Sequence, residues 1–143
     1  MGVRMFPASH APIGALVSFT IGGPWGIALG VASHYAADLI GEHCYQDRKA
    51  EIGWEGLWLL SVLSVLGSTG HWYAIGAAIA AVLVDIGLIL VRLKILSPDA
   101  GRSLHLAIHF GGIEARVRLG AASQQVLNCL LFVAVAWIAW ATK

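Results

Sequence analysis

The chain has 143 residues, enough for one domain, and 58% of them are hydrophobic while only 12% are charged. Soluble proteins carry roughly 25% charged residues, so this composition and a mean hydropathy of +0.76 exclude an ordinary soluble domain and indicate a membrane protein. The formal net charge of +1, with no basic stripe, gives no sign of nucleic-acid binding, and Cys44 and Cys129 form no disulfide framework or metal-binding motif.

The first apolar stretch covers residues 11–40, which is too long for one straight membrane helix. Gly22, Gly23 and Pro24 interrupt it, and an interior proline costs a helix about 3 kcal/mol. We therefore expect two half-helices that are either broken in line or folded back as a re-entrant pair. The choice matters for chemistry, because a straight helix would hold His10 and His34 about 36 Å apart, whereas a fold-back brings them together.

Three further apolar runs predict membrane spans at residues 54–68, 73–91 and 125–142. Tryptophans lie near the ends of these runs, as they do at the head-group level of bilayers. The short GSTGH turn at residues 67–71 predicts that the first two runs form an antiparallel pair. The expected fold is an all-α polytopic membrane protein with four transmembrane helices in a single domain, residues 1–143.

Basic residues predict the orientation, because loops rich in Lys and Arg stay on the cytoplasmic side. Arg48 and Lys49 follow the first stretch, and five more basic residues separate the third and fourth spans: Arg92, Lys94, Arg102, Arg116 and Arg118. Both connections are therefore expected on the cytoplasmic side of the membrane. Arg4 joins them only if the first stretch folds back.

The connection between the last two spans contains LHLAIHFGGIEARVRL, residues 104–119. Alternating apolar residues on both sides of Gly111 and Gly112 predict a cytoplasmic β-hairpin. The alternative is a helix, in which His105 and His109 would form a metal-binding pair one turn apart. In a strand the two histidines lie about 13 Å apart, so the hairpin argues against such a pair.

Ionisable residues crowd the end of the first stretch in ASHYAADLIGEH, residues 32–43. His34 and Asp38 lie one helical turn apart on the same side, so both can reach one divalent cation, or the carboxylate can orient the imidazole. Ionisable residues inside membrane segments are rare and are functional hypotheses by default. Glu42 continues the line, although it and His43 also suit an ordinary helix end in contact with water.

Asp85 lies deep in the third predicted span, where an acid costs roughly 2.5 to 3.5 kcal/mol and needs a partner. Its expected depth matches that of His34 and Asp38, so the three side chains can converge. The alternatives are a packing hydrogen bond or an ion pair, with these candidates: Ser18, Thr20, Ser61 and Arg92.

Two motifs resemble those of bacterial membrane-bound metal-dependent hydrolases: SHAPIGALVSF, with His10, and ASHYAADLI, with His34 and Asp38. The resemblance covers about the first 45 residues. It implies a multi-pass protein of the bacterial inner (cytoplasmic) membrane that binds a divalent metal, zinc or manganese, through His10, His34 and Asp38, with Asp85 as a further candidate ligand. The implied activity is hydrolysis of a phosphoester or lipid-derived substrate at the cytoplasmic face, with Glu42 or Asp85 as the catalytic proton acceptor.

Two other functions remain open. The chain can be a non-catalytic subunit or scaffold that forms a homo-oligomer or membrane complex through its hairpin and its glycine-rich helices. It can also be a haem-bearing anchor, although His34 and His71 are expected at opposite membrane faces and no CxxCH motif is present.

Overall fold

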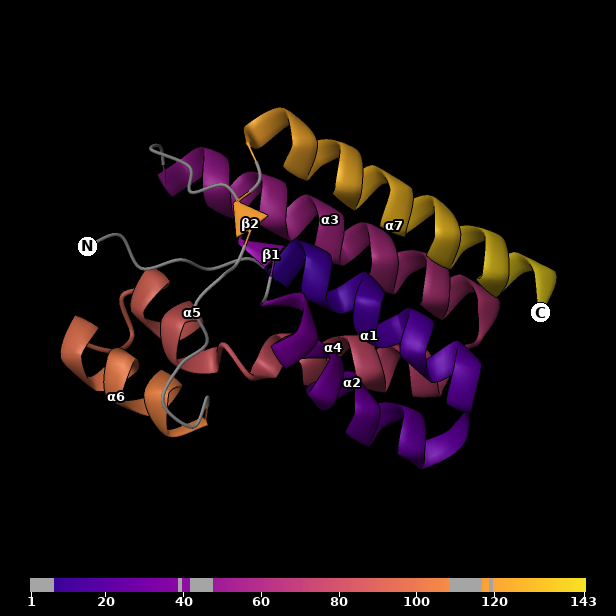
Figure 1. Ribbon diagram of the computed structural model, residues 1–143, viewed down its shortest axis with the longest axis horizontal. Coiled ribbons are helices and arrows are strands. Elements are labelled where there is room, and N and C mark those ends of the chain that lie inside the picture. Colours follow the sequence, from indigo (N-terminus) through magenta and orange to yellow (C-terminus); the bar gives the residue numbers. More distant parts are fainter. Residues whose placement is uncertain (1–6, 39, 42–47, 109–116, 119) are drawn as a thin grey trace.

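The computed structural model describes residues 7–38, 40–41, 48–108, 117–118 and 120–143 (Figure 1). This part of the chain is almost entirely helical. Its elements, in chain order, are α1 (Pro7–Ile21), α2 (Gly23–Ala37), β1 (Ile40–Gly41), α3 (Arg48–Thr69), α4 (Trp72–Leu83), α5 (Ile86–Arg92), α6 (Pro98–Ile108), β2 (Val117–Arg118) and α7 (Ala121–Ala141).

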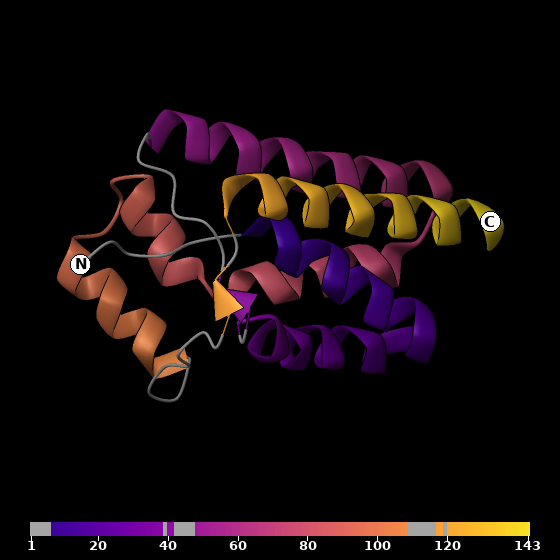
Figure 2. The ribbon, with the colours of Figure 1, turned by 45° about the horizontal axis from the view of Figure 1, so that its top comes forward.

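The first apolar stretch folds back on itself, the second of the two arrangements expected there. Helix α1 ends at Ile21, α2 begins at Gly23, and the two helices lie side by side in Figures 1 and 2. Gly22 and Gly23 have φ angles of 72° and 55°, a region that glycine adopts without steric cost. Pro24 sits in the first turn of α2, where its missing N–H is not needed.

Small residues let α1, α2 and α4 approach closely. A Cβ atom added to Gly14 of α1 would lie 2.6 Å from the Ala77 carbonyl oxygen of α4, and one added to Gly30 of α2 would lie 2.8 Å from the same atom. Contacts this short require glycine at both positions. Small residues at helix contacts are typical of helices that associate in lipid, where no hydrophobic force drives their packing.

Helices α3 and α7 run in the same direction along one side of this group (Figure 1). The Trp58 Nε1–H donates to the Gln125 Oε1 at 2.7 Å and thereby sets their register. Val62, Leu66 and Val135 are fully buried between the helices. By length and composition these are the two helices, among the described residues, that are able to cross a membrane, and only 22% of each apolar segment is buried within the protein.

The prediction of four transmembrane helices is therefore wrong. Helices α1 and α2 have 15 residues each, about 22 Å, which is short of the roughly 30 Å of a bilayer core. The predicted span at residues 73–91 is also interrupted, because α4 ends at Leu83 and α5 begins after Asp85. Helix α5 then leaves the bundle towards α6 (Figure 1).

The β-hairpin prediction is also wrong. Residues 104–108, its expected first strand, belong to helix α6, and β2 pairs in parallel with β1, Val117 opposite Ile40. Gly111 and Gly112 lie outside the described residues. The start of α6 explains the error. The Ser97 hydroxyl accepts a hydrogen bond from the Ala100 N–H at 3.3 Å, and Pro98 is the first residue of the helix. These helix-start signals prevail over the alternation of apolar and polar residues at positions 104–108.

Candidate metal centre

Two histidines meet one helical turn beyond the close contact of α1, α2 and α4. His10 lies four residues before Gly14 in α1, and His34 lies four residues after Gly30 in α2. Because α1 and α2 are antiparallel, both offsets lead to the same end of the bundle. The imidazole rings stack there, with centroids 4.0 Å apart and planes inclined by 25°.

Asp38 brings a carboxylate to both rings. Its Oδ1 lies 3.5 Å from the His10 Nε2, and its Oδ2 lies 3.2 Å from the His34 Nε2. One ligand atom from each of the three residues lies within 4.8 Å of the other two. His34 is fully buried and His10 nearly so, whereas the side chain of Asp38 is 22% exposed. The cluster thus has a closed histidine side and an open carboxylate side.

The protein holds the His34 ring by its other nitrogen. The Nδ1 of His34 is 2.7 Å from the Ala81 carbonyl oxygen of α4, and a carbonyl can only accept, so Nδ1 carries the proton. In a neutral ring the Nε2 lone pair then faces the Asp38 carboxylate. Two acceptors at this distance require a proton or a cation between them. A backbone carbonyl behind the ring is also the usual way in which proteins orient a metal-binding histidine.

Asp85 extends the cluster. Its Oδ1 is 3.8 Å from the His34 Nε2 and 3.2 Å from the His105 Nδ1, and the residue is only 5% exposed. His34, Asp38 and Asp85 therefore converge in the structure, as predicted. The hydroxyls of Thr20 and Ser61, considered as partners of Asp85, donate instead to carbonyls of their own helices.

His105 is a member of the site that the hairpin interpretation set aside and that only the helical alternative considered, as a pair with His109. The hairpin interpretation placed it on a cytoplasmic strand, but it lies on α6, which packs against α5 through Gly87 and Gly101. A Cβ added to Gly87 would lie 2.5 Å from the Gly101 carbonyl oxygen. The Tyr35 hydroxyl donates to the Ile108 carbonyl oxygen at 2.9 Å and holds the end of α6 to α2. The Ser97–Pro98 helix start is the sequence signal that could have located it.

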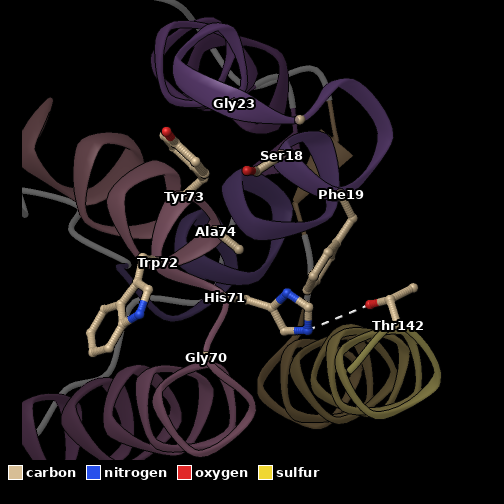
Figure 3. Close-up of a pocket in the computed structure, with 10 residues that line it drawn as sticks. Ser18, Phe19, Gly23, Gly70, His71, Trp72, Tyr73, Ala74 and Thr142 are labelled. Atoms are coloured by element: carbon tan, nitrogen blue, oxygen red, sulfur yellow. Dashed lines mark hydrogen bonds between the residues drawn. The ribbon is translucent and has the colours of Figure 1, made fainter.

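The remaining predicted residues are not part of the described centre. Glu42, the second catalytic candidate, lies outside the described residues, as do His43 and His109. His71 lies in the turn between α3 and α4 (Figure 3). It precedes the first residue of α4, whereas the Ala81 carbonyl that contacts His34 is near the other end of this helix, which agrees with the expected separation of His71 from the cluster.

The fold and the site together define a helical protein with two helices able to cross a membrane and a buried histidine and aspartate centre at one end of its bundle. No family model, curated protein or solved structure matches the chain. The resemblance to membrane-bound metal-dependent hydrolases thus rests on the two motifs around His10, His34 and Asp38.

The donor set suits a divalent metal. Two imidazole nitrogens and a carboxylate oxygen are the usual ligands of catalytic zinc, and manganese accepts the same atoms. The three residues contribute them from two helices whose close packing limits their movement. Asp85 and His105 lie beside this set and are available as an acid–base pair.

Proposed function

We propose that this chain is a membrane protein that binds one divalent metal ion through His10, His34 and Asp38 and hydrolyses a phosphoester or lipid-derived substrate. The convergence of His10 with the His34 and Asp38 pair, which lies 24 residues further along the chain, carries the proposal. One ligand atom from each of the three residues lies within 4.8 Å of the other two, so a single ion can reach all three.

The roles follow from burial and contact. A zinc or manganese ion, when bound, supplies a Lewis acid that activates water near neutral pH. Asp85 accepts the proton of the attacking water, because it is buried beside His34 and is not one of the three ligands. His105 contacts the same Asp85 oxygen and orients it. The partly exposed Asp38 marks the side from which substrate enters.

The exposed side chains support insertion into a bilayer. Large apolar residues of α3 and α7 are more than half exposed, among them Leu60, Leu130 and Val133. Most of the exposed aromatic residues lie towards the end opposite the centre, namely Trp25, Trp72, Tyr73, Trp137 and Trp140, while Trp54 lies near the start of α3. Apart from Lys143, the exposed Lys and Arg residues of the described part of the chain lie at the other end: Lys49, Lys94 and Arg102. We therefore expect α3 and α7 to cross a bacterial inner membrane with the centre at the cytoplasmic face.

A homo-oligomer or membrane complex stays a prediction. Of the two features expected to carry that assembly, the hairpin loses its first strand, because residues 104–108 belong to α6, whereas the glycine-rich helices are present. The bilayer is the partner that the exposed faces of α3 and α7 favour.

Metal analysis of the purified protein tests the proposal. After loading with zinc or manganese and removal of excess ion, the protein is expected to retain about one equivalent. A His34→Ala, Asp38→Ala double variant is expected to retain none, because one imidazole cannot hold the ion alone. His71→Ala, which removes a histidine from the far end of the bundle, is the matched control and should retain the full equivalent. Equal metal content in wild type and double variant would refute the proposed site.

A further inference from the structure

A pocket of about 390 Å³ lies at the end of the bundle opposite the candidate metal centre (Figure 3). It is formed where the turn between α1 and α2 meets the turn between α3 and α4, beside the end of α7. Nothing in the proposed hydrolysis uses it.

Three of the residues that line the pocket are glycines with positive φ angles. Gly22, Gly23 and Gly70 have φ angles of 72°, 55° and 80°, and a Cβ added to any of them would meet nothing within 4 Å. The two turns therefore leave bare backbone on two sides of the pocket, at Gly23 and at Gly70 (Figure 3). Other residues at these positions would be strained and would also fill the pocket.

His71 is the polar centre of the pocket. Its Nε2 is 2.9 Å from the Ala139 carbonyl oxygen, which can only accept, so Nε2 carries the proton and the neutral ring has its lone pair on Nδ1. Phe19 packs edge-on against the ring at 5.1 Å, and Thr142 lies beside Nε2. In Figure 3 the other nitrogen points away from Thr142 and towards the side of Ser18.

The wall of the pocket selects an uncharged ligand. None of the ten described residues that line it is an acid, a lysine or an arginine. A charged head group would lose its hydration there without gaining a counter-ion. Trp72 and Tyr73, at the rim, are 73% and 54% exposed, and amphipathic aromatic rings of this kind lie at the head-group level of bilayers.

We infer that this pocket binds the neutral, hydroxyl-bearing head group of a membrane lipid, with the lipid hydroxyl donating a hydrogen bond to the Nδ1 of His71. The acyl chains then lie outside the pocket, along the exposed apolar faces of the helices. The inference rests on the membrane insertion proposed above but not on the metal.

Native mass spectrometry of the protein released from phosphatidylcholine nanodiscs tests the inference, with dioleoylglycerol as the probe. Wild type is expected to retain dioleoylglycerol and to bind its methyl ether, which has no hydroxyl donor, about tenfold more weakly. His71→Phe keeps the ring contact with Phe19 and should show the same tenfold loss for dioleoylglycerol. In His71→Asn the side-chain amide supplies a hydrogen-bond donor and an acceptor in place of the two ring nitrogens. Its affinity for dioleoylglycerol should therefore stay within about threefold of that of wild type.

Three results would overturn the inference. They are equal binding of alcohol and ether by wild type, retention of dioleoylglycerol by His71→Phe, and occupation of the pocket by free glycerol as readily as by the lipid. The ether comparison needs no mutation, so it decides the question even if His71→Phe does not fold. A protein that fails to enter nanodiscs would instead refute the proposed membrane insertion. Failure of the proposed function and failure of the lipid-binding inference thus give different results.

Discussion

Asp85 is the residue that most clearly separates binding from catalysis in the candidate centre. It touches His34 and His105, yet the three-residue set that suits a metal is complete without it. Its burial removes water from around the carboxylate, so its partners rather than solvent determine its position. If Asp85 accepts the proton, its replacement slows turnover while the metal stays bound. If Asp85 is only structural, its replacement leaves turnover unchanged.

Asp85→Asn is expected to leave about one equivalent of metal bound and to slow hydrolysis of bis(4-nitrophenyl) phosphate at least about 100-fold, the usual contribution of a positioned general base. The amide keeps the size of the side chain but cannot accept the proton. The measurements are metal content and kcat on the same preparation. Asp99→Asn, the same change at an exposed acid on α6, should leave both unchanged. Undiminished kcat in Asp85→Asn would remove Asp85 from the mechanism.

At the scale of helices, the glycine contacts between α1, α2 and α4 determine whether the centre forms at all. Gly14 and Gly30 both face the Ala77 carbonyl, and the histidines lie one turn further along the same two helices. Separation of the helices by the width of a methyl group would move the two rings apart. The packing and the site are therefore coupled through a single contact.

Gly30→Ala is expected to lower the free energy of unfolding by about 1 to 3 kcal/mol and to weaken metal binding, because the added Cβ would lie 2.8 Å from the Ala77 carbonyl oxygen. Gly56→Ala on α3 is the matched control. A Cβ there meets nothing within 4 Å, so the change should be neutral or stabilising by up to about 1 kcal/mol, the difference in helix propensity. Denaturant unfolding in detergent measures both variants, and equal stabilities would show that the contact does not hold the helices.

At the scale of the whole molecule, its two ends differ in chemistry. One end carries the candidate metal centre and the exposed Lys49, Lys94 and Arg102. The other carries exposed tryptophans, the lipid pocket inferred here and Lys143, whose Nζ lies 5.0 Å from the Trp140 ring centroid. Because α3 and α7 run in the same direction, both lead from the first end to the second (Figure 1).

Cysteine labelling tests this orientation. In a background with Cys44→Ser and Cys129→Ala, a membrane-impermeant maleimide is expected to label Lys143→Cys in spheroplasts and Lys94→Cys only in inside-out vesicles. Labelling of both positions from the same side would show that α7 does not cross the membrane.

Local features of the sequence were sufficient for part of this description. Composition and apolar run length identified α3 and α7, since crossing a bilayer is a matter of length and hydrophobicity. Gly22 to Pro24 predicted the break between α1 and α2, because backbone conformation depends on the residue itself. The spacing of His34 and Asp38 placed them on one helix face, as any helix would.

Contacts between helices were decided only by the tertiary structure. The contacts of Asp85, the placement of His105 and the Ala81 carbonyl behind His34 all depend on how separate helices pack against one another, and no spacing within one segment contains that information. The alternation at residues 104–108 misled for the same reason, because a short pattern fits a strand or a helix until its neighbours select one. The sequence by itself therefore determined which residues are available for chemistry at one end of the protein, and the packing of the helices decided which of them meet.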